Sequence, residues 1–284
     1  MKRIHTLILF VFIVLTVFSQ EDNQGFGPRI EAGDSIIMDL YSLPSPDEIM
    51  FYIAKGEVEY SSSLYNTYSP DHYKTSKSKL LAMGIYLSDM AYAVNYKKNN
   101  KALEIFANVE TIGKQLNVFP SFPEKYRERL IRNLSNTDSL VAMYQDMYNL
   151  TMNHLDETFQ YRKYTLISIG AFVESLYLVL NSKGEIVSKA FKRRVSDQKM
   201  IYDQLIAKIP IYVERSQREN MINDMSAVTE AFESIGAQSQ QLSYKTRYDG
   251  AIRIWNKVES YDEIEGYDDL LNAVSELRNK WVSE

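Results

Sequence analysis

The fold of this chain is decided by two stretches, LLAMGIYLSDMAYAVN at residues 80–95 and LISIGAFVESLYLVLN at residues 166–181. Each stretch is apolar nearly all round, which is typical of a helix that is buried on most of its sides. Aligned at an offset of 86 positions, both stretches carry a glycine, then a pair made of one serine and one acid, and a final asparagine. The two stretches therefore predict a pair of matched core helices.

We interpret this likeness as a weak duplication, in which residues 70–157 and 160–236 form two pseudo-repeats. Each unit would be a buried helix followed by amphipathic helices; a chance likeness between two apolar helices is the alternative. Glycine within a helix costs up to about 1 kcal/mol relative to alanine, and it is tolerated where another helix must come close. Gly84 and Gly170 therefore predict the point where the two helices cross.

Apolar residues recur at helical spacing through residues 45–236, which we expect to form one helical bundle domain. Ser45 and Pro46 are suited to the cap and the first position of a helix. A long helix is expected to begin at Ser69-Pro70-Asp71 and to include residues 80–95.

The second half of the bundle is expected to contain one helix over residues 185–208 and another over residues 212–235. Pro210 lies between them, and proline ends or kinks a helix because it lacks the backbone N–H.

The character of the chain changes over residues 237–284. Apolar and polar residues alternate on both sides of Asp249-Gly250, which predicts a β-hairpin with a tight turn. A final helix is expected over residues 266–282. The predicted fold class is therefore all-α, an irregular multi-helix bundle with a small C-terminal β-hairpin and a final helix.

The first 19 residues are typical of a secretory signal peptide. Lys2 and Arg3 precede an apolar run at residues 7–18, and Val17 and Ser19 suit the −3 and −1 positions of a cleavage site. The run is too short for a membrane span. We expect cleavage after Ser19, a flexible leader over residues 20–44, and a periplasmic or secreted protein without stable membrane insertion.

The composition excludes several classes of function. The chain has no cysteine, which excludes disulfides, thiol catalysis and the lipid anchor of a bacterial lipoprotein. A net charge of −5 without a basic stripe argues against nucleic-acid binding. His72 and His154 have no second metal ligand at helical spacing, and the chain contains no nucleotide-binding or hydrolase motif, so we expect no metal, no cofactor and no recognisable catalytic residue.

The two acids within the apolar helices are the candidate site. A buried carboxylate is costly unless it is paired or hydrogen-bonded, so Asp89 and Glu174 predict either a central polar binding site or a structural network with tyrosine hydroxyls. The candidate binding residues in the groove between the two units are Tyr86, Asp89, Tyr92, Phe172, Glu174 and Tyr177.

The chain resembles a family of exported, all-helical proteins of unknown function from Bacteroidota-type bacteria. The resemblance rests on LPSPDEI at residues 43–49, GIYLSDMAY at 84–92, NTDSL at 136–140 and GAFVESLY at 170–177. The family patterns are GxYxxDLxY and GGWIESLY, and Ala171 and Phe172 stand where the second has glycine and tryptophan, so a role of that indole does not carry over. The resemblance covers residues 43–180 and implies the fold and the compartment, but no activity.

We therefore expect a soluble exported protein that acts as a binding or scaffold module of the bacterial cell envelope, with an envelope protein or peptide as partner. One alternative is a hydrolase-like enzyme that uses Asp89 and Glu174 as an acid–base pair in a central cleft. The other alternative is a purely structural protein.

Overall fold

The structure is a computed structural model of the chain, which describes residues 45–54, 58–119, 124–133, 136–182, 188–239, 242–246, 252–256 and 266–284. The predicted signal peptide at residues 1–19 and the predicted leader at residues 20–44 lie outside these described residues. Residues 43–284 belong to one compact unit.

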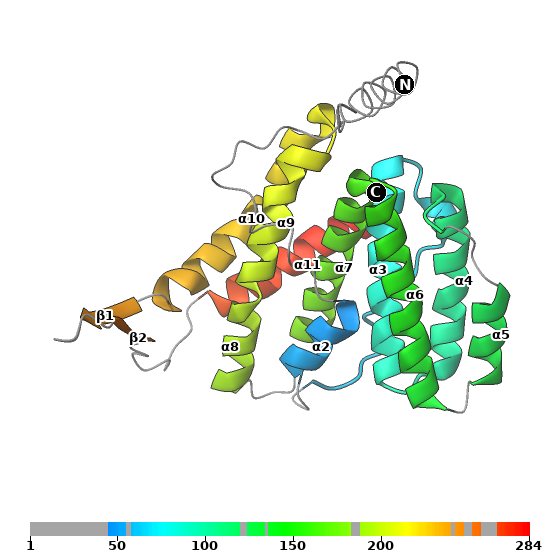
Figure 1. Ribbon diagram of the computed structural model, residues 1–284, viewed down its shortest axis with the longest axis horizontal. Helices are drawn as coiled ribbons and strands as arrows, with labels where there is room; N and C mark the ends of the chain where they lie inside the picture. Colours follow the sequence, from blue (N-terminus) through cyan, green and yellow to red (C-terminus); the bar gives the residue numbers. More distant parts are fainter. Residues whose placement is uncertain are drawn as a thin grey trace, which may run out of the picture. The chain divides into compact units, whose positions relative to one another are not determined.

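Helices make up most of the described chain, which confirms the all-α class (Figure 1). Their bounds, with the short 3-10 helix η1, are α2 (Pro46–Ala54), η1 (Pro70–His72), α3 (Ser76–Asn95), α4 (Asn99–Leu116), α5 (Glu124–Arg132), α6 (Thr137–Glu157), α7 (Tyr161–Asn181), α8 (Lys189–Asp197), α9 (Lys199–Tyr212), α10 (Arg215–Ser239) and α11 (Tyr267–Ser283).

Residues 80–95 lie in α3 and residues 166–181 lie in α7, and these two helices pack against each other along their length. A Cβ atom built on Gly84 would lie 2.5 Å from the backbone nitrogen of Ala171, and one built on Gly170 would lie 3.0 Å from the Cα of Leu81. Both distances are far below ordinary van der Waals contact. The predicted crossing of the two helices at their glycines is therefore confirmed.

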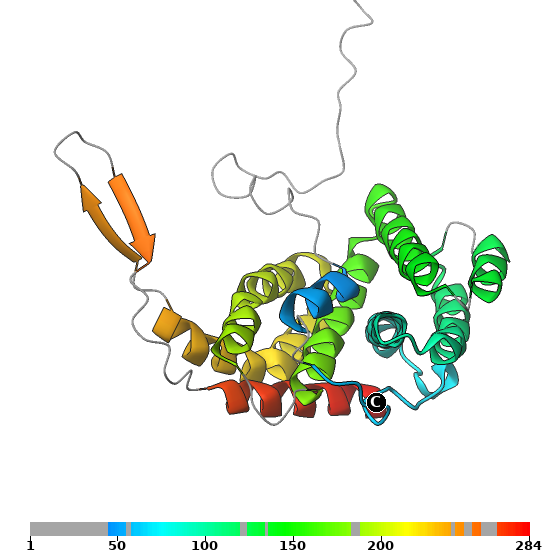
Figure 2. The ribbon, with the colours of Figure 1, turned by 90° about the horizontal axis from the view of Figure 1, so that it is seen from below.

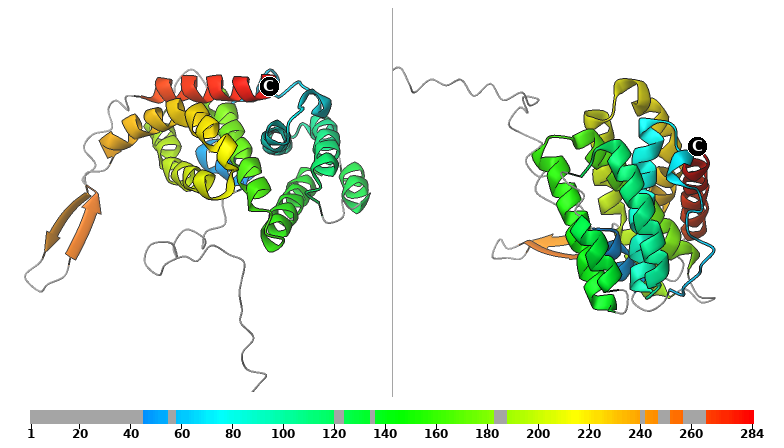
Figure 3. Two further views of the ribbon diagram at one scale, coloured as in Figure 1. Left: turned by 90° about the horizontal axis from the view of Figure 1, so that it is seen from above. Right: turned by 90° about the vertical axis from the view of Figure 1, so that its right-hand side faces the viewer.

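The remaining helices cover this central pair (Figures 2 and 3). Helices α4 and α6 pack on α3, while α2, α9 and α11 pack on α7. Helix α10 packs against both α9 and α11, and the short α5 lies against α6. The centre of α3 and α7 is thus enclosed by helices from both halves of the chain.

Helix α7 is long and apolar enough to cross a membrane, and it alone passes that test within the described ranges. However, 89% of its apolar window is buried inside the protein. Such burial is what the core helix of a bundle shows, because neighbouring helices take the place that lipid would occupy.

The start of the first core helix differs from the prediction. Ser69-Pro70-Asp71 begins η1, a single 3-10 turn, and α3 starts only at Ser76. Thr75 caps α3 through a reciprocal capping box with Ser78, which satisfies two backbone N–H groups that the helix leaves free. This box sets the start of α3, and the proline upstream fits the first position of the 3-10 turn.

The second half of the bundle also differs from the prediction. The single helix expected over residues 185–208 is two helices, α8 and α9, which meet at Gln198. Pro210 lies inside α9, close to its end at Tyr212, instead of between two helices. The proline removes one backbone hydrogen bond and crowds the carbonyl four residues before it, and α9 ends shortly after it, at Tyr212.

Two short segments after α10, β1 (Leu242–Thr246) and β2 (Ile252–Asn256), pair antiparallel, with Leu242 opposite Asn256. The turn that would join them, residues 247–251, lies outside the described residues. The C-terminal β-hairpin therefore stays a prediction, as do the two pseudo-repeats.

Candidate functional site

The two acids of the core helices meet at the centre of the bundle. Asp89 on α3 and Glu174 on α7 are both 0% exposed, and their carboxyl groups are within hydrogen-bonding reach of each other. The helices bring them together because the close glycine contact lies just over one turn before each acid. The structure therefore brings Asp89 and Glu174 together in one buried polar group.

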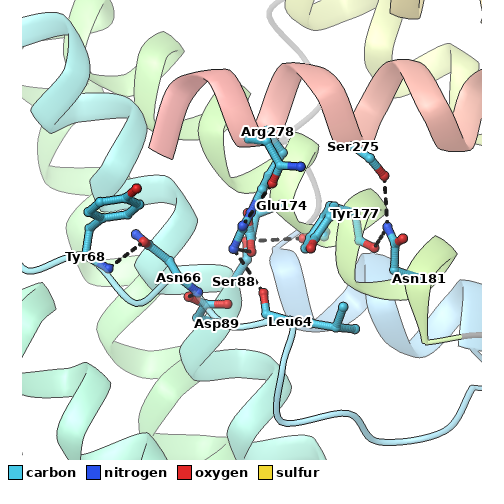
Figure 4. A network of polar contacts seen from close by, with 12 residues as sticks. Leu64, Asn66, Tyr68, Ser88, Asp89, Glu174, Tyr177, Asn181, Ser275 and Arg278 are labelled. Atoms are coloured by element: carbon cyan, nitrogen blue, oxygen red, sulfur yellow. Dashed lines mark hydrogen bonds and ion pairs between the residues drawn. The ribbon is translucent and has the colours of Figure 1, made fainter. Parts of the chain in front are cut away.

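A third charged residue completes the group (Figure 4). Arg278 on α11 donates from Nε to Glu174 Oε2 at 2.9 Å and from Nη2 to Glu174 Oε1 at 3.2 Å. The same Nη2 donates to the backbone oxygen of Leu64 at 3.0 Å. This two-pronged contact is the strongest geometry that an arginine and a carboxylate form, and it ties α11 to α7.

Asp89 is held more weakly than Glu174. Its Oδ2 accepts a hydrogen bond of 3.0 Å from the backbone N–H of Asn66. Within the described part of the chain, its Oδ1 receives no N–H or hydroxyl donor. Burial, together with the charge of Glu174, raises the pKa of Asp89 well above its usual value.

The serines beside the acids are used within the helix pair. Ser88 and Ser175 each donate from Oγ to the backbone oxygen of Ala171 at 2.8 Å, and their own oxygens lie 3.2 Å apart. These bonds satisfy two buried hydroxyls without any solvent or ligand.

The predicted tyrosines serve as structural ties. Tyr86 donates its hydroxyl to the backbone oxygen of Tyr68 at 2.6 Å, and the Tyr92 hydroxyl lies 2.8 Å from the Ser182 hydroxyl. Tyr177 is half-buried, and its ring centre lies 4.3 Å from the guanidinium carbon of Arg278, a cation–π contact. Each ring thus fixes a loop or a side chain around the acids.

Phe172 is the predicted site residue that the structure separates from the others. Its ring lies 6.1 Å from that of Tyr202 on α9, and it lines a small hollow beside Ser168 and Ile49. Two residues along a helix point to nearly opposite sides, so Phe172 and Glu174 face different neighbours.

The group formed by Asp89, Glu174 and Arg278, hereafter the buried triad, is closed to solvent. A glycosidic acid–base pair needs carboxyls about 5–9.5 Å apart around a substrate. The two acids instead lie in hydrogen-bonding reach, and Arg278 occupies the remaining polar side of Glu174. The arrangement suits a structural network far better than a catalytic one.

Sequence reasoning missed Arg278 and the backbone of Asn66. The signal for Arg278 was present: it lies four residues after Val274 and three before Trp281, within the apolar stripe of α11. A cation on such a stripe indicates a buried anion opposite. No local signal marks the N–H of Asn66, because a backbone donor has no sequence signature.

The described ranges contain no group of three histidine, cysteine or acidic side chains that could hold a metal ion. His72 stacks on Tyr68, with ring centres 4.2 Å apart. His154 lies on α6, half-buried.

The surface holds a second unusual group, which sequence reasoning did not single out. Phe159, in the turn between α6 and α7, is 77% exposed, and its ring centre lies 5.9 Å from that of Tyr161. The Tyr161 ring is in turn 5.0 Å from the ring of Tyr212 at the end of α9, beside Ile211, which is 54% exposed. We call Phe159, Tyr161, Ile211 and Tyr212 the aromatic corner.

Phe159 has an unfavourable backbone. It takes a positive φ of 57°, and the turn closes with hydrogen bonds from its own N–H to Asp156 and from Gln160 to Leu155. This is the Schellman arrangement, in which the left-handed position normally holds glycine. A large aromatic side chain at this position is rare and costs stability.

Comparisons of this chain with protein-family models, with curated proteins and with solved structures found no match.

Proposed function

We propose that this protein is an exported binding or scaffold module of the bacterial cell envelope, and that it holds a partner protein or peptide through the aromatic corner. The proposal includes membership of the family of exported helical proteins that residues 43–180 resemble.

The single observation that carries the proposal is the exposure of Phe159 in a strained turn. An exposed ring contributes nothing to the core, and glycine or asparagine would fit this backbone at lower cost. Backbone strain that the fold does not need gathers at functional positions. Through Tyr161 the ring of Phe159 is linked to Tyr212, whose neighbour in the sequence, Ile211, is exposed too, and exposed apolar side chains that gather are typical of protein contacts.

The interior supports the same proposal by elimination. Glu174 bonds to Arg278, Ser88 and Ser175 bond to the backbone oxygen of Ala171, and Asp89 accepts from the backbone N–H of Asn66. A substrate would have to displace these contacts before it met either acid. A role that uses the outer surface requires no such opening.

Export is supported by the charged start, the apolar run at residues 7–18 and the small residues before Gln20. The test is the N-terminal sequence of the protein taken from the producing cells. Protein that starts at Gln20 in the envelope or culture fluid supports export, whereas protein that retains residues 1–19 in the cytoplasm contradicts it.

The partner is tested by placing a photo-crosslinking amino acid at position 159 in the producing cells. Phe51 on α2 is 74% exposed and provides a matched control, because it is a similarly exposed phenylalanine in a different element, a helix without backbone strain at that position. We expect one discrete crosslinked product from position 159, none from position 51, and loss of the product when Tyr212 is also changed to Ser.

Equal, diffuse crosslinking from positions 159 and 51 would contradict a specific surface at the aromatic corner. That outcome would favour the purely structural alternative.

A further inference from the structure

The buried triad has an imbalance of charge that its contacts alone do not resolve. It contains two carboxyl groups and one guanidinium, all shielded from water. If both acids were ionised, one negative charge would remain in the core without a counter-ion, which is strongly unfavourable. Arginine keeps its proton in proteins, so the balance must come from an acid.

The hydrogen bonds identify which acid takes the proton. Glu174 accepts both prongs of Arg278, so its ionised form is well satisfied. Asp89 accepts one backbone bond on Oδ2, and among the described residues its Oδ1 has no donor, although Glu174 is in hydrogen-bonding reach of the Asp89 carboxyl group. A proton on Oδ1 would turn this orphaned atom into a donor toward the Glu174 carboxylate.

We propose that Asp89 and Glu174 form a binding site for one proton, held on Asp89 and shared with Glu174, and that this proton makes the buried triad electrically neutral. The site goes beyond the proposed surface function and does not depend on it.

Burial also raises the pKa of Glu174, although Arg278 opposes that shift, and the described tyrosines around Asp89 do not supply a charge between pH 4 and 9. The titratable or charged groups around it are Glu174 and Tyr177 from α7, Arg278 from α11, Tyr65 and Tyr73 from the segment between α2 and α3, and Tyr86 and Tyr92 from α3 itself. Burial raises the pKa of Tyr73 to about 12 and raises the pKa of the other four tyrosines too. The tyrosines therefore stay neutral.

The site makes stability depend on pH in a defined direction. An aspartate in the unfolded chain has a pKa of about 3.9. Asp89 binds its proton more tightly in the folded protein, so the folded state carries the extra proton above that pH. The contribution of this site to stability is therefore fully present below about pH 4, falls as the pH rises, and levels off above the folded pKa of Asp89. The unfolding equilibrium constant rises by up to about tenfold per pH unit in that window.

The test compares urea unfolding of the protein with that of Asp89→Asn from pH 4 to pH 9. An asparagine amide keeps both contacts of a protonated aspartate, since its oxygen accepts from Asn66 and its NH₂ donates to Glu174. We expect the one-proton slope in the original protein and its loss in Asp89→Asn. The control is Asp203→Asn, which removes an exposed acid paired with Lys199 on α9 and should keep the slope.

A second measurement decides the question even where a variant fails to fold. The carboxyl carbon of Asp89, followed by ¹³C NMR in the unaltered protein, should show the protonated form at pH 6. An ionised Asp89 at pH 6, or parallel unfolding profiles for the protein and Asp89→Asn, would overturn the proposal.

Discussion

The buried triad and the aromatic corner are opposite departures from the usual distribution of side chains. The triad places charges where apolar groups belong, and the corner places aromatic rings where polar groups belong. In the triad, Arg278 donates to Glu174 and the N–H of Asn66 donates to Asp89, while the backbone oxygen of Leu64 accepts from Arg278. At the corner nothing in the chain covers Phe159, at least within the residues that are described. The triad is a departure that the fold compensates internally, whereas the exposure of Phe159 is one that it leaves open, and we propose that a partner covers it.

The largest loss of stability is expected for substitutions of Arg278. Replacing it by Leu leaves Glu174 without its counter-ion in the core, and loss of one partner from a buried ion pair costs about 3–5 kcal/mol. We expect that loss in the free energy of unfolding measured with urea at pH 7. Arg278→Lys is the control: it keeps the charge but loses the two-pronged contact, so its cost should be smaller. A loss below about 1 kcal/mol for Arg278→Leu would show that the contact between Arg278 and Glu174 does little to stabilise the fold.

The next largest effect is expected at the helix crossing that brings the acids together. In Gly84→Ala the added methyl group would collide with the backbone of α7, which cannot move without separating the helices. Such overpacking costs about 1–3 kcal/mol, and Gly84→Leu should cost more. Differential scanning calorimetry measures the change as a lower Tm.

Gly113 on α4 provides the matched control for this crossing. A methyl group there would meet only the ring of Phe119, a side chain that can rotate away. Gly113→Ala should therefore change stability much less. An unchanged Tm for Gly84→Ala would show that the crossing is looser than the contacts indicate.

The smallest change in stability is expected at the aromatic corner, for Phe159→Gly. The change relieves the positive φ and should raise the free energy of unfolding by about 1 kcal/mol, while crosslinking from a neighbouring position such as 161 to the partner should fall. Lys97 has the same φ of 57° at the end of α3, so Lys97→Gly should bring a similar gain without any effect on the partner. A loss of stability in Phe159→Gly would mean that the ring serves the fold.

The local parts of this fold could be predicted because their signals are local. The apolar runs of α3 and α7, and the glycines within them, determine which faces meet, and the acids follow from the same helices. The helix starts were less predictable. Ser69-Pro70 and Thr75 both carry start signals within a few residues, and only the capping box formed in three dimensions selects the later one.

The parts that could not be predicted depend on distant contacts or on shape. Arg278 lies 104 residues after Glu174, and nothing near either residue indicates that they pair. The backbone strain at Phe159 depends on how α6 ends, which the sequence around it does not reveal because glycine is absent there. The sequence thus indicated the two buried acids, but not the counter-ion Arg278 or the closure of the triad to solvent.

The position of Arg278 in α11 also has a consequence for how the protein is made. Every other helix of the bundle precedes α11 in the chain, and the guanidinium spans 214 residues of sequence to reach the backbone of Leu64. A chain that is synthesised or exported from its N-terminus therefore carries two unneutralised acids in its core helices until its final helix arrives. A product cut short before Arg278 lacks the guanidinium that pairs with Glu174, so we expect proteases to cleave it more readily than a product that includes α11.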